Sequence, residues 1–409
     1  MTNDSIHMTT VEEAGFIIAS NAKDYGTEEL PFEEALGRVL AETITADRDL
    51  PPYNRVTMDG IAIRIQDFLN GARRFFIQAT QAAGDPPVDI YVQNNCVEIM
   101  TGASLAATIN AVVPYEQIDI TDGIACIKEG VDVLQNQNTH PQGKDKKQHE
   151  MMVAAGTTID ATTINIAAAV GKTMLLVKKL PRVVIISTGD ELVAVNETPL
   201  PYQVRRSNNY GMQAVLAQHS IRPFLLHLPD EPAVLRQQLQ ACLEAYDVIL
   251  LSGGVSMGKF DYVPRVLEEL QVVKFFHKVR QRPGKPFWFG THIAGALVFA
   301  FPGNPVASFM CLHRYFIPWL AASQGIAPKN TVAVLGEAVA FAPALQYFLQ
   351  VNMQVSPDGT LVAMPAAGNG SGDFANLTAA NAFLELPANR DSFEKGGVFR
   401  AWPFKNILW

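Results

Sequence analysis

Runs of apolar residues, separated by more polar stretches, dominate the middle of the chain. The runs at 183–186, 224–226 and 248–251 have the length and composition of buried strands. Helical patterns lie between them, beginning near Asn208 and after Asp230. Because parallel strands must be joined by long crossovers, usually helices, this alternation predicts a mostly parallel sheet covered by helices on both faces. Ligands bind such sheets at the carboxyl ends of the strands.

The N-terminal residues show two helical patterns. The segment Thr10-Val11-Glu12-Glu13 has the spacing of a capping box and predicts the start of a first helix. A second helix is predicted after Pro31, because the apolar residues between positions 32 and 40 fall on one helical face. Both helices are interpreted as structural.

Residues 49–145 have a different character. Strand-like runs such as 74–80 and 96–100 are separated there by turns rich in proline and glycine, which predicts a β-rich module. A further helix is predicted with Asp160 as its N-cap and Gly171 as its stop. The module therefore reads as an insertion between two parts of one helical scaffold.

The C-terminal region begins with a helix from Pro305 to about Ala322. Strand-like runs follow at 331–340, 348–355 and 382–386, with glycine-rich turns between them. These runs predict a small β-barrel or a β-sandwich.

Composition narrows the class of protein. With 409 residues and 48% hydrophobic content, the chain needs several cores. A net charge of −8, with no basic run longer than 144–147, argues against binding to nucleic acid or anionic lipid. The four cysteines and eight histidines show no disulfide or metal-ligand spacing, and no apolar run reaches membrane-spanning length. We expect a cytoplasmic protein.

A glycine-rich loop directly follows the strand pattern at 248–251. It reads Ser252-Gly253-Gly254-Val255-Ser256-Met257-Gly258, and glycine lets successive backbone N–H groups approach an anion closely. A plain tight turn is the better explanation of such a loop when it stands alone. Its position at a strand end favours an anion site.

Two later segments strengthen this interpretation. A Pro-Gly turn is surrounded in the sequence by four cations, Lys278, Arg280, Arg282 and Lys285. In the segment 301–305, Asn304 can cap a helix whose first residue is Pro305, so that free N–H groups face the strand ends. Arg280 alone is interpreted as a solvated residue. Together the segments predict a site for a phosphorylated ligand.

Carboxylates occupy comparable loop positions at Glu191, Asp230 and Asp261. Several acids beside one anion are reasonable if they bind Mg²⁺, which bridges carboxylates to phosphates. For Asp230 a simple helix N-cap is an equally good interpretation. In the β-rich module, Asp59 and Thr101 lie in turn-forming loops, where ordinary turn chemistry is the simpler explanation.

The ordered motifs resemble those of the MoeA-type molybdopterin molybdenumtransferases, a family that includes the C-terminal part of gephyrin. The matching stretches span most of the chain: PPYNRVTMDGIAIR at 51–64, EIMTGASLAATINAVVPYEQ at 98–117, GKD at 143–145, STGDEL at 187–192, SNN at 207–209, LSGGVSMGKFDY at 251–262, HKVRQRPGKPFWFG at 277–290 and FPGNPVASF at 301–309. Their order and spacing make the match specific.

The resemblance implies a multidomain architecture of α/β and β parts. The implied domains are an elongated scaffold from 1–48 and 146–180, an inserted β-rich domain at 49–145, a molybdopterin-binding α/β domain at 181–327 and a C-terminal β-barrel at 328–409. It also implies a homodimer with a cleft shared between subunits. Candidate partners are a molybdopterin adenylyltransferase and a molybdoenzyme or carrier.

The implied reaction takes adenylylated molybdopterin and molybdate, releases AMP in a Mg²⁺-dependent step and leaves molybdenum on the dithiolene as molybdenum cofactor. Carried over by motif, catalytic positions fall on Asp59, Thr101, Asp145, Asp230, Asp261, Lys278 and Arg282. Ligand-binding positions fall on Ser252, Gly253, Gly254, Ser256, Gly258, Lys285, Pro302, Gly303, Asn304 and Pro305. Candidate metal ligands are Glu191, Asp230 and Asp261.

Some motif positions depart from the family pattern. Arg206 stands where members read aspartate before Ser-Asn, and Lys144 replaces the glutamate of Gly-Glu-Asp. A second interpretation is therefore a catalytically impaired molybdopterin-binding or scaffold homologue. A third is a molybdopterin adenylyltransferase, whose central domain is similar, although the inserted module and the barrel favour the molybdenum-inserting type.

Overall fold

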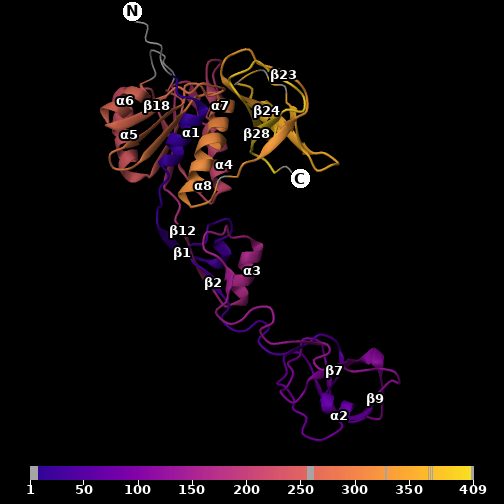
Figure 1. The fold of residues 1–409 in the computed structure, drawn as a ribbon. Helices are drawn as coiled ribbons and strands as arrows, with labels where there is room; N and C mark the ends of the chain where they lie inside the picture. The colour runs from indigo at the N-terminus through magenta and orange to yellow at the C-terminus, as the bar shows by residue number, and fades with distance from the viewer. Residues whose placement is uncertain are drawn as a thin grey trace, which may run out of the picture. The chain divides into compact units, whose positions relative to one another are not determined.

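A computed structural model describes residues 8–255, 262–327, 329–366, 368, 370 and 372–406 (Figure 1). The chain divides into two compact units. The first comprises Met1–Glu29, Gly37–Val39 and Leu176–Trp409, and the second comprises Leu30–Leu36 and Leu40–Leu175. None of the described helices has the length and apolar character needed to cross a membrane.

A six-stranded sheet forms the centre of the first unit. Its order is β16 (Phe224–Leu228), β13 (Val183–Thr188), β17 (Val248–Ser252), β21 (Leu297–Phe301), β20 (Trp288–His292) and β18 (Val272–His277). The four strands from β16 to β21 are parallel, and β20 pairs antiparallel with both of its neighbours, β21 and β18. The predicted, mostly parallel sheet is confirmed.

Helices cover both faces of this sheet, because successive strand residues point to opposite sides. One face packs against α1 (Val11–Ser20), α4 (Ser207–Ala217) and the helical segment that begins at Pro305. The other packs against α5 (Pro232–Ala245) and α6 (Val263–Glu269), as Figure 1 also shows. In β13, for example, Ile185 lies in the first core and Ile186 in the second.

Local signals explain where the first helix begins. Thr10 Oγ1 accepts the Glu13 N–H at 3.1 Å, and the Glu13 carboxylate accepts the Thr10 N–H at 2.8 Å, so the predicted capping box is confirmed. The helix predicted from Pro305 is also present but not uniform. It consists of α7 (Pro305–Cys311), a π-helical turn η3 (Leu312–Phe316) and α8 (Ile317–Ser323).

The C-terminal strands close into a barrel. The ring runs through β24 (Gln346–Val355), β25 (Leu361–Pro365), β22 (Val332–Leu335), β28 (Val398–Pro403) and β26 (Ala382–Leu386), and β26 pairs back to β24. This pairing decides between the two predicted forms in favour of a barrel. The short strand β19 (Gln281–Arg282) pairs in parallel with β24. Smaller elements are β23 (Val339–Ala340), β27 (Ser392–Phe393) and the 3₁₀ turn η4 (Phe374–Thr378).

The second unit contains a six-stranded sheet. Its order is β7 (Ala111–Pro114), β4 (Gly60–Ile63), β6 (Asn95–Ile99), β5 (Arg74–Gln81), β9 (Ile124–Ile127) and β8 (Ile118–Thr121). The strand predictions at 74–80 and 96–100 are confirmed within a residue. Short ribbons join β10 (Thr139–His140) to β3 (Arg55–Val56) and β11 (Met151–Val153) to β2 (Ile44–Thr45). The remaining helical elements are α2 (Ile65–Leu69) and η2 (Tyr115–Gln117).

Two predictions about scaffold helices have different outcomes. Helix α3 (Ala161–Ala169) has Asp160 at its N-cap, accepting the Thr163 N–H at 2.8 Å, as predicted. The helix predicted after Pro31 is wrong. Only the 3₁₀ turn η1 (Phe32–Glu34) forms there, preceded by β1 (Thr27–Pro31), which pairs with β12 (Met174–Lys178). Gly37, with φ of +79°, turns the chain out of the helical conformation, which the apolar spacing could not reveal.

Candidate functional site

A cavity of about 1530 Å³ opens at the carboxyl ends of β13 and β17. It is lined by the loops after these strands, by the beginnings of α4 and α7, by the segment after β19 and by parts of the barrel. The location is the one predicted for a ligand of this type of sheet.

Two glycines of the predicted anion loop have conformations that require glycine. Gly253 and Gly254 have φ values of +99° and +65°. A Cβ atom on Gly253 would lie 2.8 Å from the Thr188 carbonyl oxygen, and one on Gly254 would lie 2.6 Å from Thr188 Oγ1. The loop thus lies directly against the end of β13. Ser256, Gly258 and Asp261, which complete the predicted motif, are outside the described residues.

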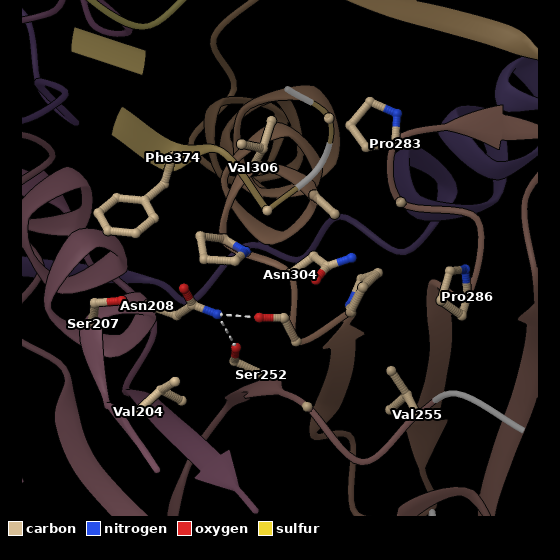
Figure 2. A pocket seen from close by; sticks show the side chains of 18 of the residues that line it. Val204, Ser207, Asn208, Ser252, Val255, Pro283, Pro286, Asn304, Val306 and Phe374 are labelled. Atoms are coloured by element: carbon tan, nitrogen blue, oxygen red, sulfur yellow. Dashed lines mark hydrogen bonds between the residues drawn. The ribbon is translucent and has the colours of Figure 1, made fainter. Parts of the chain in front are cut away.

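Asn208 holds two walls of the cavity together. Its Nδ2 donates to Ser252 Oγ at 2.9 Å and to the Gly303 carbonyl oxygen at 2.8 Å (Figure 2). Ser252 ends β17 and Gly303 precedes α7, so one amide fixes the glycine loop relative to the start of that helix. Asn304 is the N-cap of α7 and Pro305 its first residue, as predicted, but the Asn304 side chain makes no capping hydrogen bond.

The predicted cations are partly brought together. Arg282 and Lys285 both line the cavity, on either side of the Pro283-Gly284 turn. Gly284 has a φ of +92°, and a Cβ there would lie 2.8 Å from both Cys311 Sγ and Gln281 Nε2. Lys278 is not among the described residues that line the cavity. Its backbone N–H donates to the Phe287 carbonyl oxygen at 3.0 Å.

A buried network supports this turn. Gln281 is fully buried, and its Nε2 donates to the Gly284 carbonyl oxygen at 3.0 Å. The hydroxyl of Tyr315, in the π-helical turn η3, donates to Gln281 Oε1. Arg282 contacts the barrel, because its guanidinium lies 5.7 Å from the ring centre of Phe341. Sequence reasoning missed Gln281 and Tyr315, although a glutamine between two cations in a strand was an available signal.

Two predicted metal ligands line the cavity. These are Glu191 and Asp230, and the Asp230 N–H donates to the Asp190 carboxylate at 3.1 Å. Among the described residues, no three His, Cys, Asp or Glu side chains gather closely enough to hold a metal ion. A complete metal site from described residues alone is therefore absent.

Two arginines add positive charge to the same cavity. Arg205 and Arg206 line it at the end of β15 (Val204–Arg205), which pairs with β14 (Leu192–Val193). Arg206 Nε donates to the Val193 carbonyl oxygen at 3.3 Å. Burial lowers the pKa of nearby His227, and the charge of Arg206 lowers it further. The unusual Arg206 therefore contributes to the field of the site.

The remaining predicted residues belong to the second compact unit. Asp59 Oδ1 accepts the Thr101 N–H at 2.6 Å and the Thr101 hydroxyl at 2.7 Å, and these bonds hold the pKa of Asp59 below its usual value. Asp145 Oδ1 lies 2.8 Å from His140 Nε2. The sequence assigned Asp59 and Thr101 to turn-forming loops, and the hydrogen bonds between them were not predicted.

Comparisons with known proteins cover nearly the whole chain. Family models match in chain order: the MoeA N-terminal region (domain I and II) at 9–171, a probable molybdopterin binding domain at 184–322 and the MoeA C-terminal region (domain IV) at 332–404. A molybdopterin molybdenumtransferase from Synechocystis sp. is 38% identical over 96% of this chain and 99% of its own. The chain belongs to the MoeA family.

Other MoeA relatives agree with this membership. A molybdopterin molybdenumtransferase from Haemophilus influenzae is 29% identical over 93% of this chain and 95% of its own. The crystal structure of a molybdopterin biosynthesis MoeA protein from Pyrococcus horikosii has a TM-score of 0.83 and 26% identity, covering 98% of this chain and all of that one. The multidomain MoeA architecture, with its parallel central sheet and C-terminal barrel, is therefore the fold of this chain.

Proposed function

We propose that this protein is a molybdopterin molybdenumtransferase, which transfers molybdenum from molybdate to adenylylated molybdopterin and releases AMP. The observation that carries the proposal is one cavity lined by Gly253 and Gly254 together with Arg282 and Lys285. Its substrates are anions, and the positive charges of Arg282 and Lys285 favour an anion. A glycine loop adds to this through backbone N–H groups that are not bonded within the protein. The names of the full-length relatives support the same reaction.

The residues divide into two chemical roles. Arg282 offers a planar fork of donors that can grip two oxygens of a phosphate or of tetrahedral molybdate, whereas Lys285 acts as a point charge. Placed beside molybdate and the phosphate that molybdopterin retains, both stabilise negative charge on the substrates as AMP departs. Asn208 fixes the position of the glycine loop relative to the start of α7. Within the loop, the Gly253 N–H donates to the Phe301 carbonyl oxygen at 3.2 Å.

Mg²⁺ dependence is part of the proposal. Glu191 and Asp230 supply carboxylates from within the cavity, and Asp261 is proposed as a further ligand. Carboxylate oxygens together with substrate phosphates are the usual ligands of Mg²⁺, and the ion would neutralise the phosphates during AMP release. Titrating the purified protein with Mg²⁺ after treatment with a chelator tests this. Full turnover in the absence of divalent ions would refute it.

Asp59, Thr101 and Asp145 are proposed as further catalytic residues, and the protein as a homodimer. Alanine at Asp59 should abolish turnover and leave the thermal midpoint nearly unchanged, because the carboxylate is exposed and its described hydrogen bonds are all made to Thr101. A large loss of stability would instead support ordinary turn chemistry. The mass in solution tests the dimer.

The deciding experiment mixes the protein with adenylylated molybdopterin, Mg²⁺ and molybdate. AMP release and reconstitution of a cofactor-free molybdoenzyme are both expected. Tight binding of molybdopterin without either signal would favour the impaired homologue, for which Arg206 is the motivating observation. In that case, Arg206→Asp should restore turnover.

A further inference from the structure

One wall of the cavity carries an aromatic ring that the anion chemistry leaves unused. Phe374 begins η4 and lines the cavity, yet 54% of its surface is exposed. Figure 2 shows its ring projecting from the C-terminal ribbon into the pocket, on the opposite side from Pro283 and Pro286. A phenylalanine that packs the barrel core would be buried, as Phe393 is.

The segment that carries this ring is held in place. Asn376 Nδ2 donates to Gln350 Oε1 at 3.2 Å and to the Ala366 carbonyl oxygen at 3.1 Å, which ties η4 to β24 and to the end of β25. Leu377 packs against the large core of the first unit. The exposed ring is thus presented on a fixed turn and not on a free chain end.

Positive charge lies in the same cavity, apart from the Arg282–Lys285 turn. Arg206 is part-buried and lines the cavity. Within the described residues, Nε is the one guanidinium atom that makes a hydrogen bond, so the terminal amino groups remain to bind an oxyanion. In Figure 2, Ser207 and Val204, which flank the Arg205–Arg206 pair, lie on the side of Phe374, away from Pro283 and Pro286.

An exposed ring combined with an arginine fits a nucleotide. Nucleobases stack on aromatic side chains, and arginine binds phosphate. We propose that Phe374 and Arg206 form the subsite for the adenylate part of the substrate, with adenine on the ring and the AMP phosphate on the guanidinium. This rests on the proposed function. The adenylate is the part that leaves, so the open position of Phe374 suits it better than the pterin, which must be retained while molybdenum is bound.

The test measures binding of four probes to the purified full chain by calorimetry: AMP, ribose 5-phosphate, inorganic phosphate and 6-hydroxymethylpterin. Phe374→Leu keeps an apolar side chain but removes the aromatic face. The substitution should lower the affinity for AMP roughly 5- to 30-fold and leave the affinity for ribose 5-phosphate unchanged. Arg206→Gln should lower the affinity for AMP and the affinity for ribose 5-phosphate alike, each by roughly tenfold.

Matched controls are available. Phe224 is also 54% exposed and Arg265 has 79% of its side chain exposed, and neither is among the described residues that line the cavity. Phe224→Leu and Arg265→Gln should leave all affinities unchanged. Each variant is first checked for an unaltered thermal midpoint. Phe374, Phe224 and Arg265 are exposed and should tolerate their changes, whereas Arg206 is part-buried, so its check matters most.

Several outcomes would overturn the subsite. Unchanged AMP affinity in Phe374→Leu would remove the stacking role, and a selective loss of 6-hydroxymethylpterin would assign the ring to the pterin. Failure of the wild-type chain to bind AMP would remove the subsite altogether. The proposed function is tested separately, because molybdenum insertion by the wild-type chain is measured without reference to any of these variants.

Discussion

Tyr315 donates a hydrogen bond to the side chain of Gln281, and both residues are almost completely buried. Gln281 in turn donates to the carbonyl oxygen of Gly284, between the two cations of the anion site. The π-helical turn η3 contains Tyr315, and such turns are frequent at functional sites. The pair therefore connects the interior of the first unit to the turn that carries Arg282 and Lys285.

Tyr315→Phe should loosen this turn. The substitution leaves Gln281 Oε1 buried without its donor, which costs about 1–3 kcal/mol. Denaturant unfolding measures that loss, and steady-state kinetics should show a higher KM for adenylylated molybdopterin. An unchanged KM together with a full loss of stability would limit Tyr315 to packing.

Gly284→Ala should be more damaging than an ordinary glycine substitution. The new Cβ would meet Cys311 Sγ and Gln281 Nε2 at 2.8 Å, in a conformation with positive φ. Strain and overpacking together cost about 2–4 kcal/mol, and displacement of the cations should lower kcat/KM roughly 10- to 100-fold. Gly325→Ala is the control, because Gly325 also has positive φ, at +76°, but nothing lies within 4 Å of its Cβ position. Equal effects at the two sites would contradict the prediction.

Glu385→Gln should destabilise the contact between the barrel and the helical segment after Pro305. Glu385 Oε2 lies 3.2 Å from Arg314 Nε, without the alignment of a hydrogen bond, and both side chains are buried. Glu385 also accepts the Trp402 indole N–H at 2.6 Å. Leaving Arg314 without its counter-charge should cost about 3–5 kcal/mol in denaturant unfolding. Glu150→Gln, which breaks an exposed pair with Lys146, should change little.

His313 should make the free energy of unfolding depend on pH. Burial lowers its pKa from 6.5 to about 3, and His219 adds to the effect. Between these values the unfolded chain binds a proton that the folded chain excludes, so stability falls as pH falls. The slope approaches that of one proton, about 1 kcal/mol for each pH unit, well inside the interval from 6.5 to 3. Unfolding measured from pH 7 to 4 should show a shallower slope in His313→Asn, and identical slopes would refute this.

Local signals made several features predictable from the sequence. The capping box at Thr10, the Asp160 cap and the glycines after β17 depend on neighbouring residues, so they could be read along the chain. The prediction of a helix after Pro31 was wrong, because the same apolar spacing also suits a short 3₁₀ turn that is followed by Gly37 with positive φ.

Long-range relationships could not be predicted in this way. Gln281 and Tyr315 are separated by 34 positions, and Tyr315 lies in the π-helical turn η3. Lys278 was predicted beside Arg282, but it is not among the described residues that line the cavity. Cations close in sequence need not share a site when the backbone turns between them. The four domain boundaries and the roles of the individual carboxylates stay predictions.

The pairing of β19 with β24 makes the anion site depend on a part of the chain far from it in sequence. Gln281 aligns with Gln346 and Arg282 with Tyr347. The short strand β19 of the central region therefore has its pairing partner, β24, in the barrel. A shortened gene product that ends before the barrel would keep the glycine loop and lose the neighbour of the arginine strand. We therefore expect gene truncations and fusions that separate these regions to weaken ligand binding, even though every catalytic motif remains in the shortened chain.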